Sequence, residues 1–491
     1  MKGSSTGNIG TLLLLRKLWA GVLNIFIISF IARLLDKSDF GLLVVSGVFI
    51  SFMDTLGPAS IGEYLIYYDD KEKPGVINSA FWLNLFIHVI IICITIILAP
   101  YWAHYYNNDK IKYMTYLLAA GFFGSIFSAI PTAMLKKRMD FKPVIFIQAI
   151  TGTLFQLTQL ALAIIGFGVY SLAIPTAIFP LVAGIYLFYK ARPAIKLNFG
   201  TKYWVEIIRY IRYSIGSKIL SRLSNDGDSL IIGKMTGLAA LGVYNISSKL
   251  SNLLNQNIMP ILDDVSMPLF VKNNTKYTII RKQFLYVIRV TSLFLTPFYF
   301  LLIIFAPIII TSLYGEKWVD AILPLQILCI CSLVKTISYP TATLFYALGK
   351  PKIDFYTTLI YAPVFLLLVW IFSQKGLIAA CIVIAALRIV NTMYYIYKSG
   401  SLISLTFFNF FSEIKHLVIA NLLLGGLTLV TLHFLHNLNL KYLMMVFYMP
   451  SAYFLTYLLY KKRMLKDYLL IYKFFPALNF IRNKTVPGIN A

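Results

Sequence analysis

The sequence predicts an all-α polytopic membrane protein, with about fourteen transmembrane helices in two parallel six-helix lobes and two further C-terminal helices. Composition is the first reason, because 491 residues that are 59% hydrophobic and 13% charged carry too little polar surface to enclose a soluble core. The second is that the apolar runs are long and continuous, whereas the strands of a membrane barrel alternate. The third is an internal repeat with a spacing of about 200 residues.

Fourteen segments are predicted as spans, because each is long enough to cross the hydrocarbon core as a helix. Three of them, 41–65, 208–232 and 240–260, are too polar for a simple hydropathy window and are inferred from flanking charges and parity. In chain order the predicted spans are 18–35, 41–65, 78–100, 113–135, 143–166, 168–189, 208–232, 240–260, 284–311, 321–348, 353–373, 376–398, 412–435 and 440–460.

The distribution of Lys and Arg predicts the orientation of these spans, because basic residues concentrate in short cytoplasmic loops. With the N-terminus inside, thirty of the 44 Lys and Arg fall in inside segments and eight in outside segments. Both termini are therefore expected in the cytoplasm. The formal net charge of +25 is mainly this orientation signal, together with an attraction for anionic membrane lipid, rather than a nucleic-acid binding surface.

The sequence carries no motif for catalysis or metal binding. The four cysteines lie in apolar runs at spacings that match neither a metal nor a redox site: Cys93, Cys329, Cys331 and Cys381. No Asp or Glu lies next to His433 and His436 in the sequence, and neither a Gly-rich phosphate loop nor a nucleophile elbow occurs. The first apolar run lacks a cleavage pattern and is expected to remain as a span. We therefore expect no metal, no cofactor and no enzyme activity.

Short sequence echoes indicate that a six-helix unit occurs twice. They are Gly41 with Gly242 at an offset of 201, Ala99-Pro100 with Ala306-Pro307 at 207, and Pro131 with Pro340 at 209. Since six is even, both copies have the same orientation, and transporters with such parallel repeats place substrate at the repeat interface. The predicted regions are an N-terminal lobe, 1–200, a C-terminal lobe, 201–400, and an appended region with a basic tail, 401–491.

Six basic residues remain inside the predicted spans, where a charge is costly and by default faces a cavity or a partner. These candidates for substrate binding are Lys218, Arg222, Lys249, Arg289, Lys335 and Arg388. Polar residues recur at helical spacing on two of the spans and form one stripe on each, so both helices are expected to line water. The polar candidates from these stripes are Ser217, Ser221, Asn225, Asn252 and Gln256.

The acids inside the spans are counted as four, Asp54, Glu63, Asp226 and Asp228. Cations are then in excess, so the cavity should attract an anion. Arg offers a bidentate fork for phosphate or carboxylate, and Lys offers a mobile point charge. Asp54 and Asp226 are the candidates for a coupling ion, either H⁺ or Na⁺.

Each basic residue also has a plain structural explanation, which the sequence leaves open. Long side chains near a helix end can extend to the interface, and residues four apart on a helix can pair. The alternatives are extension of Arg289 to the interface, pairing of Arg222 with Asp226, pairing of Lys218 or Arg222 with Asp54, and structural ion pairs for Lys335 and Arg388.

The order FIARLLDKSDFGLLVVSGVFISFMDTLGPASIGEYLI, from Phe30 to Ile66, followed by YGEKWVDAILPLQILCICSLV from Tyr314, resembles a known transporter family. It is similar to polysaccharide-export flippases of the multidrug, oligosaccharidyl-lipid and polysaccharide exporter superfamily, of the Wzx-like, colanic-acid exporter type. Such proteins are fourteen-helix, two-lobe transporters that flip lipid-linked oligosaccharide to the outer leaflet of the bacterial inner membrane by alternating access.

The resemblance implies undecaprenyl-pyrophosphate-linked oligosaccharide as the substrate, for the synthesis of a surface polysaccharide such as lipopolysaccharide or exopolysaccharide. It implies a polysaccharide polymerase and chain-length machinery as candidate partners. It would place the charged lumen of the family on Lys218, Arg222 and Lys249 of this chain.

Two other functions are weighed against this one. An ion-coupled multidrug exporter of the same superfamily would have the same lobes, but cationic drugs favour an acidic cavity. A membrane-embedded glycosyltransferase or polymerase would need a catalytic acid or base in an outer-face domain, and the longest predicted outer loops have only about a dozen residues.

Overall fold

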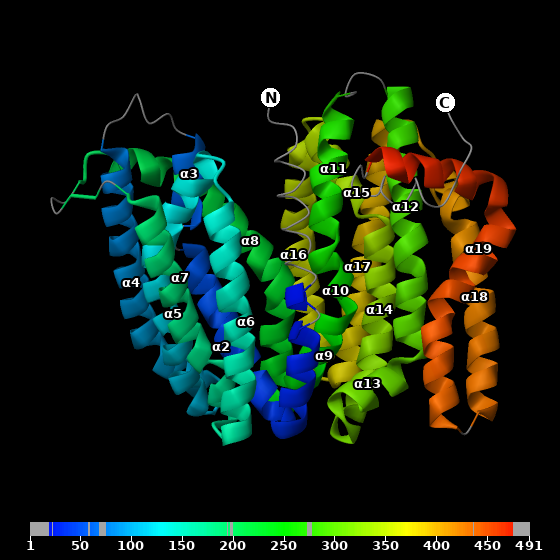
Figure 1. Ribbon diagram of the computed structural model, residues 1–491, viewed down its shortest axis with the longest axis horizontal. Coiled ribbons are helices and arrows are strands. Elements are labelled where there is room, and N and C mark those ends of the chain that lie inside the picture. The colour runs from blue at the N-terminus through cyan, green and yellow to red at the C-terminus, as the bar shows by residue number, and fades with distance from the viewer. Residues whose placement is uncertain are drawn as a thin grey trace. The chain divides into compact units, whose positions relative to one another are not determined.

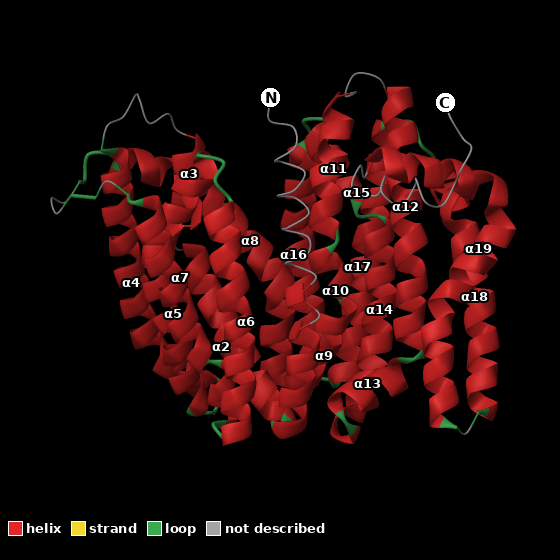
Figure 2. Cartoon of the chain, in the orientation of Figure 1, coloured by secondary structure: helices red, strands yellow, loops and turns green. Residues whose placement is uncertain are grey.

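The computed structural model describes residues 19–21, 23–56, 59–67, 75–193, 195–196, 200–272, 277–435 and 437–474. Within these ranges every regular element is helical (Figures 1 and 2). Ten helical segments in this part of the chain are long and apolar enough to cross a membrane, and a shorter apolar helix covers Trp19–Leu34. The predicted all-α, multi-pass membrane fold is confirmed, and fourteen spans are compatible with it.

The chain divides into two compact units. Unit 1 comprises Met1–Asn245 with Leu366–Leu377, and unit 2 comprises Ile246–Phe365 with Ile378–Ala491. The lobe boundaries predicted near residues 200 and 400 follow the sequence repeat and stay a prediction.

In unit 1 the short helix Trp19–Leu34 precedes the charged turn near Asp36, the other helices follow this turn, and the last of them crosses the unit boundary. They are α2 (Lys37–Leu56), α3 (Ala59–Tyr67), α4 (Val76–Tyr105), α5 (Lys110–Lys137), α6 (Lys142–Ile165), η1 (Gly168–Leu172), α7 (Ile174–Ala191), α8 (Trp204–Met235) and α9 (Leu238–Ser251). The polar segment 208–232 thus forms a continuous helix, α8, as predicted.

Helices of unit 2 are shorter on average, because several are interrupted. They are α10 (Leu253–Asn257), α11 (Met259–Lys272), α12 (Tyr277–Ile304), α13 (Ala306–Tyr314), η2 (Glu316–Ala321), α14 (Ile322–Ile337), α15 (Pro340–Ala347), α16 (Pro351–Ser373), α17 (Leu377–Leu402), α18 (Phe407–Phe434) and α19 (Leu438–Phe474). Figure 1 shows α18 and α19, the appended pair, running side by side.

In unit 1 the predicted spans 41–65 and 168–189 each correspond to two helices, α2 with α3 and η1 with α7. Three further predicted spans, 240–260, 284–311 and 321–348, are divided at breaks that lie in unit 2. Proline has no backbone N–H, so it cannot donate to the carbonyl four residues earlier and interrupts the ladder. The prolines at or just after these breaks are Pro260, Pro307 and Pro340.

The echo between Pro100 and Pro307 corresponds to a repeated structural feature. In unit 1 the carbonyl four residues before Pro100 accepts a hydrogen bond from the Tyr116 hydroxyl of α5, at 3.3 Å. In unit 2 the carbonyl four residues before Pro307 accepts one from the Gln326 amide of α14, at 2.9 Å. In both places a side chain from a later helix satisfies the backbone oxygen that the proline leaves without its usual donor.

The echo between Gly41 and Gly242 corresponds to a mirrored contact between the first turns of α2 and α9. A Cβ added to Gly41 would lie 1.9 Å from the Leu238 carbonyl oxygen, and one added to Gly242 would lie 2.0 Å from the Lys37 carbonyl oxygen. Lys37 and Leu238 are separated by the same 201 residues as the two glycines. In each copy of the repeat the glycine therefore lies against the backbone carbonyl of the equivalent residue in the other copy. Only glycine lets the two backbones come this close.

Candidate functional site

The polar stripe predicted from helical spacing lies along the middle of α8. Lys218 and Arg222 occupy successive turns, with side chains that are 36% and 46% exposed. Ser221 and Asn225 are exposed beside them, while the side chain of Ser217 lies outside the described part of the structure. Charged groups half-exposed in the middle of a membrane helix face water rather than lipid, because transfer of a charge into hydrocarbon is costly.

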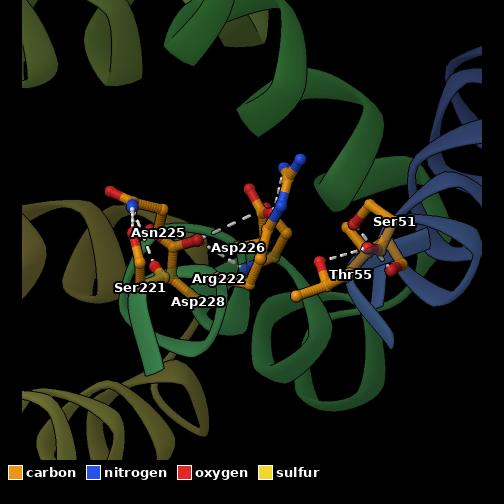
Figure 3. Close-up of polar contacts among 9 residues, drawn as sticks. Ser51, Thr55, Ser221, Arg222, Asn225, Asp226 and Asp228 are labelled. Carbon is orange, nitrogen blue, oxygen red and sulfur yellow. Dashed lines mark hydrogen bonds and ion pairs between the residues drawn. The ribbon is translucent and has the colours of Figure 1, made fainter. Parts of the chain in front are cut away.

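Both cations of this stripe are held by carboxylates of unit 1. Lys218 Nζ lies 2.8 Å from Glu63 Oε1 of α3. Arg222 Nη1 lies 3.1 Å from Asp226 Oδ2 one turn later, as Figure 3 shows. The alternative that Arg222 pairs with Asp226 is confirmed. The partner of Lys218, however, is Glu63 rather than Asp54. Half-exposed pairs of this kind contribute at most about 1 kcal/mol to stability, so an incoming anion can displace the carboxylates at low cost.

Asp228 differs from its neighbours on α8 because its carboxylate is buried and fully hydrogen-bonded. Its side chain is 1% exposed, and Oδ2 accepts a hydrogen bond from the Tyr244 hydroxyl of α9 at 2.7 Å. Oδ1 accepts one from the Ser229 backbone N–H at 2.7 Å. Asp228 thus fixes α8 against the first half of α9, and a spacing argument alone does not separate it from Asp226.

A polar cavity of about 320 Å³ lies in unit 1, next to the Lys218–Glu63 pair. Its wall includes Asp54, the predicted coupling-ion residue, together with Glu63, His88 and Lys136. His88 is 1% exposed, and its Nδ1 lies 2.9 Å from the Asn84 carbonyl oxygen. Since a carbonyl only accepts, Nδ1 carries a proton, and in the neutral ring Nε2 is then an acceptor. We refer to this space as the unit 1 cavity.

A larger cavity of about 740 Å³ lies in unit 2, and we refer to it as the unit 2 cavity. Helices α11, α14, α15, α16 and α17 all contribute to its wall. Its ionisable residues are Asp263, Lys335, Tyr339, Tyr346, Asp354 and Tyr395. Lys335 is thus placed on a cavity, as the sequence predicts for an intramembrane cation, while the acids and tyrosines were not among the predicted site residues.

The remaining predicted residues fall in three places. Arg289 Nη1 lies 3.0 Å from Glu413 Oε2 of α18, in a pair whose side chains are only 21% and 14% exposed. The Arg388 guanidinium lies over the Phe365 ring, 5.7 Å from its centroid. The rest belong to the broken helices of unit 2, where Lys249 and Gln256 are exposed and Asn252 donates to the Ser248 carbonyl at 3.0 Å. Their role in binding stays a prediction.

The count of four acids inside the spans is too low. Asp354 lies in the first turn of α16 and Glu413 in α18, and α11 adds Asp263. Asp354 and Glu413 fall within predicted spans, but at their ends, where an acid reads as part of a loop. The predicted attraction for an anion therefore cannot rest on a general excess of cations inside the spans. Among the described residues, no group of three His, Cys, Asp or Glu is placed to hold a metal ion.

Comparison with known sequences agrees with the resemblance. Residues 30–323 match a family described as polysaccharide biosynthesis protein. The teichuronic acid biosynthesis protein TuaB of Bacillus subtilis (strain 168) is 24% identical over 298 residues, 60% of this chain and 61% of TuaB. The lipopolysaccharide biosynthesis protein WzxC of Escherichia coli (strain K12) is 23% identical over 76% of this chain and 78% of its own. The succinoglycan biosynthesis transport protein ExoT of Rhizobium meliloti (strain 1021) is 22% identical over 64% and 63%. This chain thus spans about three fifths of the length of TuaB.

Comparison with solved structures identifies the fold. The lipid II flippase MurJ, in an inward closed conformation, matches with a TM-score of 0.75 and 12% identity over 92% of this chain and 99% of MurJ. An inward-facing multidrug resistance MATE family transporter of the MOP superfamily matches with a TM-score of 0.57 and 17% identity, over 80% of this chain and 94% of its own. Because the family model covers more than half of the chain, this multi-pass membrane protein belongs to the polysaccharide biosynthesis protein family, and its fold is the one found in MurJ and the MATE transporter.

Proposed function

We propose that this protein flips polyprenyl-pyrophosphate-linked oligosaccharide from the cytoplasmic to the outer leaflet of the bacterial inner membrane, for the synthesis of a surface polysaccharide. The observation that carries the proposal is family membership. The relatives are named for three different polymers, teichuronic acid, lipopolysaccharide and succinoglycan, and one is named a transport protein. A fold shared with a lipid II flippase supports a lipid-linked sugar as cargo. On this proposal the chain is a transporter rather than an enzyme.

The pyrophosphate head group would be held by Lys218 and Arg222. A doubly charged head group with a polar glycan cannot cross hydrocarbon without a large desolvation penalty, and fixed cations in water-filled space replace its hydration. Because Glu63 and Asp226 hold these cations through half-exposed contacts, the phosphate oxygens can exchange with the carboxylates. The lipid tail stays in the bilayer, and alternating access of the two lobes exposes the site to each leaflet in turn.

The membrane potential supplies part of the driving force for such a cycle. An anion that leaves a negative interior moves down the potential, by about 2.3 kcal/mol per elementary charge per 100 mV. The contribution of a coupling ion would add to this, with H⁺ or Na⁺ binding at Asp54 in the unit 1 cavity or at Asp226 on α8. Both termini would lie in the cytoplasm. On the outer side of the membrane, a polysaccharide polymerase with its chain-length machinery would use the flipped oligosaccharide as its substrate.

A transport assay in reconstituted vesicles distinguishes this function from multidrug export. We expect the protein to move lipid-linked oligosaccharide across the bilayer and to leave a cationic dye where it is. In cells, deletion of the gene should cause lipid-linked oligosaccharide to accumulate on the cytoplasmic side. Dye transport without movement of the lipid-linked oligosaccharide would refute the proposal and favour the multidrug exporter.

Exchanging the two cations tests the head-group site. Arg222→Lys keeps the charge and loses the bidentate fork, so flipping should fall well below wild type, whereas Lys218→Arg should be tolerated. Loss of one charge-assisted contact corresponds to about 1.5–3 kcal/mol, or roughly a 10- to 150-fold weaker affinity. Arg209→Lys, at the exposed start of the same helix, is the matched control. If the double variant Arg222→Gln with Asp226→Asn flips at the wild-type rate, the pair is only structural and the assignment is wrong.

A further inference from the structure

We propose that the unit 2 cavity binds the glycan part of the cargo, as a subsite made of different residues from those that hold the pyrophosphate. The inference rests on the proposed function, because it takes a lipid-linked oligosaccharide as the cargo. It adds to that function the chemistry by which the sugar itself is recognised.

The size and lining of the cavity suit a hydroxyl-rich ligand. A volume of about 740 Å³ falls within the range of roughly 300–1,000 Å³ that is typical of small-ligand sites. The wall offers carboxylates, phenols, aliphatic hydroxyls and an amide, from Asp354, Tyr395, Thr341 and Asn391 among others. Each sugar hydroxyl both donates and accepts a hydrogen bond, so a wall that mixes acceptors and donors in this way can satisfy it.

Asp354 fixes two of the aromatic rings on the cavity wall. Its Oδ2 accepts a hydrogen bond from the Tyr346 hydroxyl of α15 at 2.7 Å, and its Oδ1 accepts one from the Tyr395 hydroxyl of α17 at 2.6 Å. The two rings, from different helices, are thereby held in place before a ligand arrives. Both phenols are used as donors, so their oxygens still accept hydrogen bonds from a ligand, and the ring faces offer an apolar surface for the C–H faces of a sugar.

Asn391 is the wall residue best placed to recognise a ligand directly. Its side chain is half-buried on α17, and among the described residues it has no hydrogen-bond partner. An amide carries two donors and one acceptor, which is the combination that pairs with neighbouring hydroxyl groups. Changing it should affect a bound sugar without removing any contact that holds the fold.

The charges of the wall argue against the other occupants. Asp263 and Asp354 face the cavity together with Lys335, so a pyrophosphate would meet more negative than positive charge. A coupling cation at Asp354 would have to share carboxylate oxygens that each already accept a phenol hydrogen bond. At Asp263, one oxygen accepts a hydrogen bond from the Thr343 hydroxyl. A neutral or amino-sugar glycan is therefore the ligand class that the lining favours.

Binding measured separately for the two parts of the cargo tests the inference. The probes are inorganic pyrophosphate and the glycan that mild acid releases from the lipid-linked pool of the host, titrated calorimetrically into the full-length protein in lipid nanodiscs. We expect Asn391→Ala to weaken binding of the released glycan by about 2- to 10-fold, as for one or two hydrogen bonds, and to leave pyrophosphate binding unchanged. Arg222→Gln should do the reverse.

A second variant and a matched control complete the design. Tyr395→Ala removes an anchored ring and should weaken glycan binding at least as much as Asn391→Ala. Tyr394→Ala, at the adjacent position on α17, changes a ring that is 42% exposed and does not line the cavity, so it should bind like wild type. If Tyr395→Ala fails to fold, Asn391→Ala alone decides, because its side chain holds no described contact.

Each outcome decides for or against the subsite. Wild-type glycan affinity in Asn391→Ala, or a wild-type protein that binds pyrophosphate but not the released glycan, overturns it. A change in binding of radioactive Na⁺ without a change in glycan binding would assign the cavity to a coupling ion instead. Failure of the proposed function is a separate result, because it would appear as a deletion strain that accumulates no lipid-linked oligosaccharide.

Discussion

The mirrored contact between Gly41 and Gly242 predicts that one added methyl group separates the first turns of α2 and α9. In the predicted topology the first turns of α2 and α9 lie at the outer face. An alanine Cβ at position 41 would lie 1.9 Å from the Leu238 carbonyl oxygen, whereas a normal carbon–oxygen contact is roughly 3.3 Å. The two helix ends must therefore separate by roughly 1.4 Å. Overpacking of this kind costs about 1–3 kcal/mol, which lowers the population of the closed contact about 5- to 150-fold.

Labelling from outside the cell measures that population. In a variant without its native cysteines, a single cysteine at Ser221 of α8 reports access to the polar stripe for a membrane-impermeant maleimide. We expect Gly41→Ala to increase the labelling rate and to reduce flipping, because separating α2 from α9 would loosen the packing of α2 against α8. Gly47→Ala is the matched control, since a Cβ at this position of the same helix meets no atom within 4 Å.

Equal labelling and equal flipping in Gly41→Ala and Gly47→Ala would refute this reasoning. The double variant provides an independent check. Because one separation of the helix ends relieves both clashes, the effect of Gly41→Ala with Gly242→Ala should be smaller than the sum of the two single effects. Additive effects would mean that the two glycines act at separate contacts.

Three further predictions concern topology, an ion pair and coupling. A cysteine at Lys317 should be labelled from outside the cell and one at Lys137 should not, and the reverse pattern would contradict cytoplasmic termini. Arg289→Glu should lower the free energy of unfolding by about 3–5 kcal/mol, because it places two carboxylates against each other in a mostly buried site, and adding Glu413→Arg should restore thermal stability. Asp54→Asn should slow flipping in a folded protein, and an unchanged rate under both proton and sodium gradients would remove Asp54 from the mechanism.

The fold could be predicted from sequence because membrane helices can be recognised by their apolar composition. Long apolar runs indicated most of the spans, and flanking charges with parity located α8, which is too polar for hydropathy. The breaks in unit 2 could not be located in the same way, because a hydropathy window averages over a proline. At Pro307 the interruption is a matter of a missing N–H, and its compensation comes from Gln326 on another helix.

The candidate site could be predicted only where its residues are close together in the sequence. The α8 stripe repeats every turn, so Arg222 and its pairing with Asp226 follow from spacing. The partner of Lys218 is Glu63, 155 residues away in the chain, and no periodic pattern relates the two. The unit 2 cavity is likewise assembled by tertiary packing of five helices, and its polar residues are spread too thinly along each helix to form a stripe.

Exposure then separates the ion pairs that hold the fold from those that a ligand can open. Arg289 and Glu413 are mostly buried, so breaking their contact would leave an uncompensated charge in a low-dielectric environment. Lys218 and Glu63 are 36% and 49% exposed, and water screens whichever partner is left behind. On the proposed function, the protein binds its cargo in one state and releases it in the other, so its contacts to the cargo must exchange with internal contacts of similar strength. The weak, solvent-exposed pairs that Lys218 and Arg222 of α8 make meet that requirement. The mostly buried pair between Arg289 of α12 and Glu413 of α18 does not.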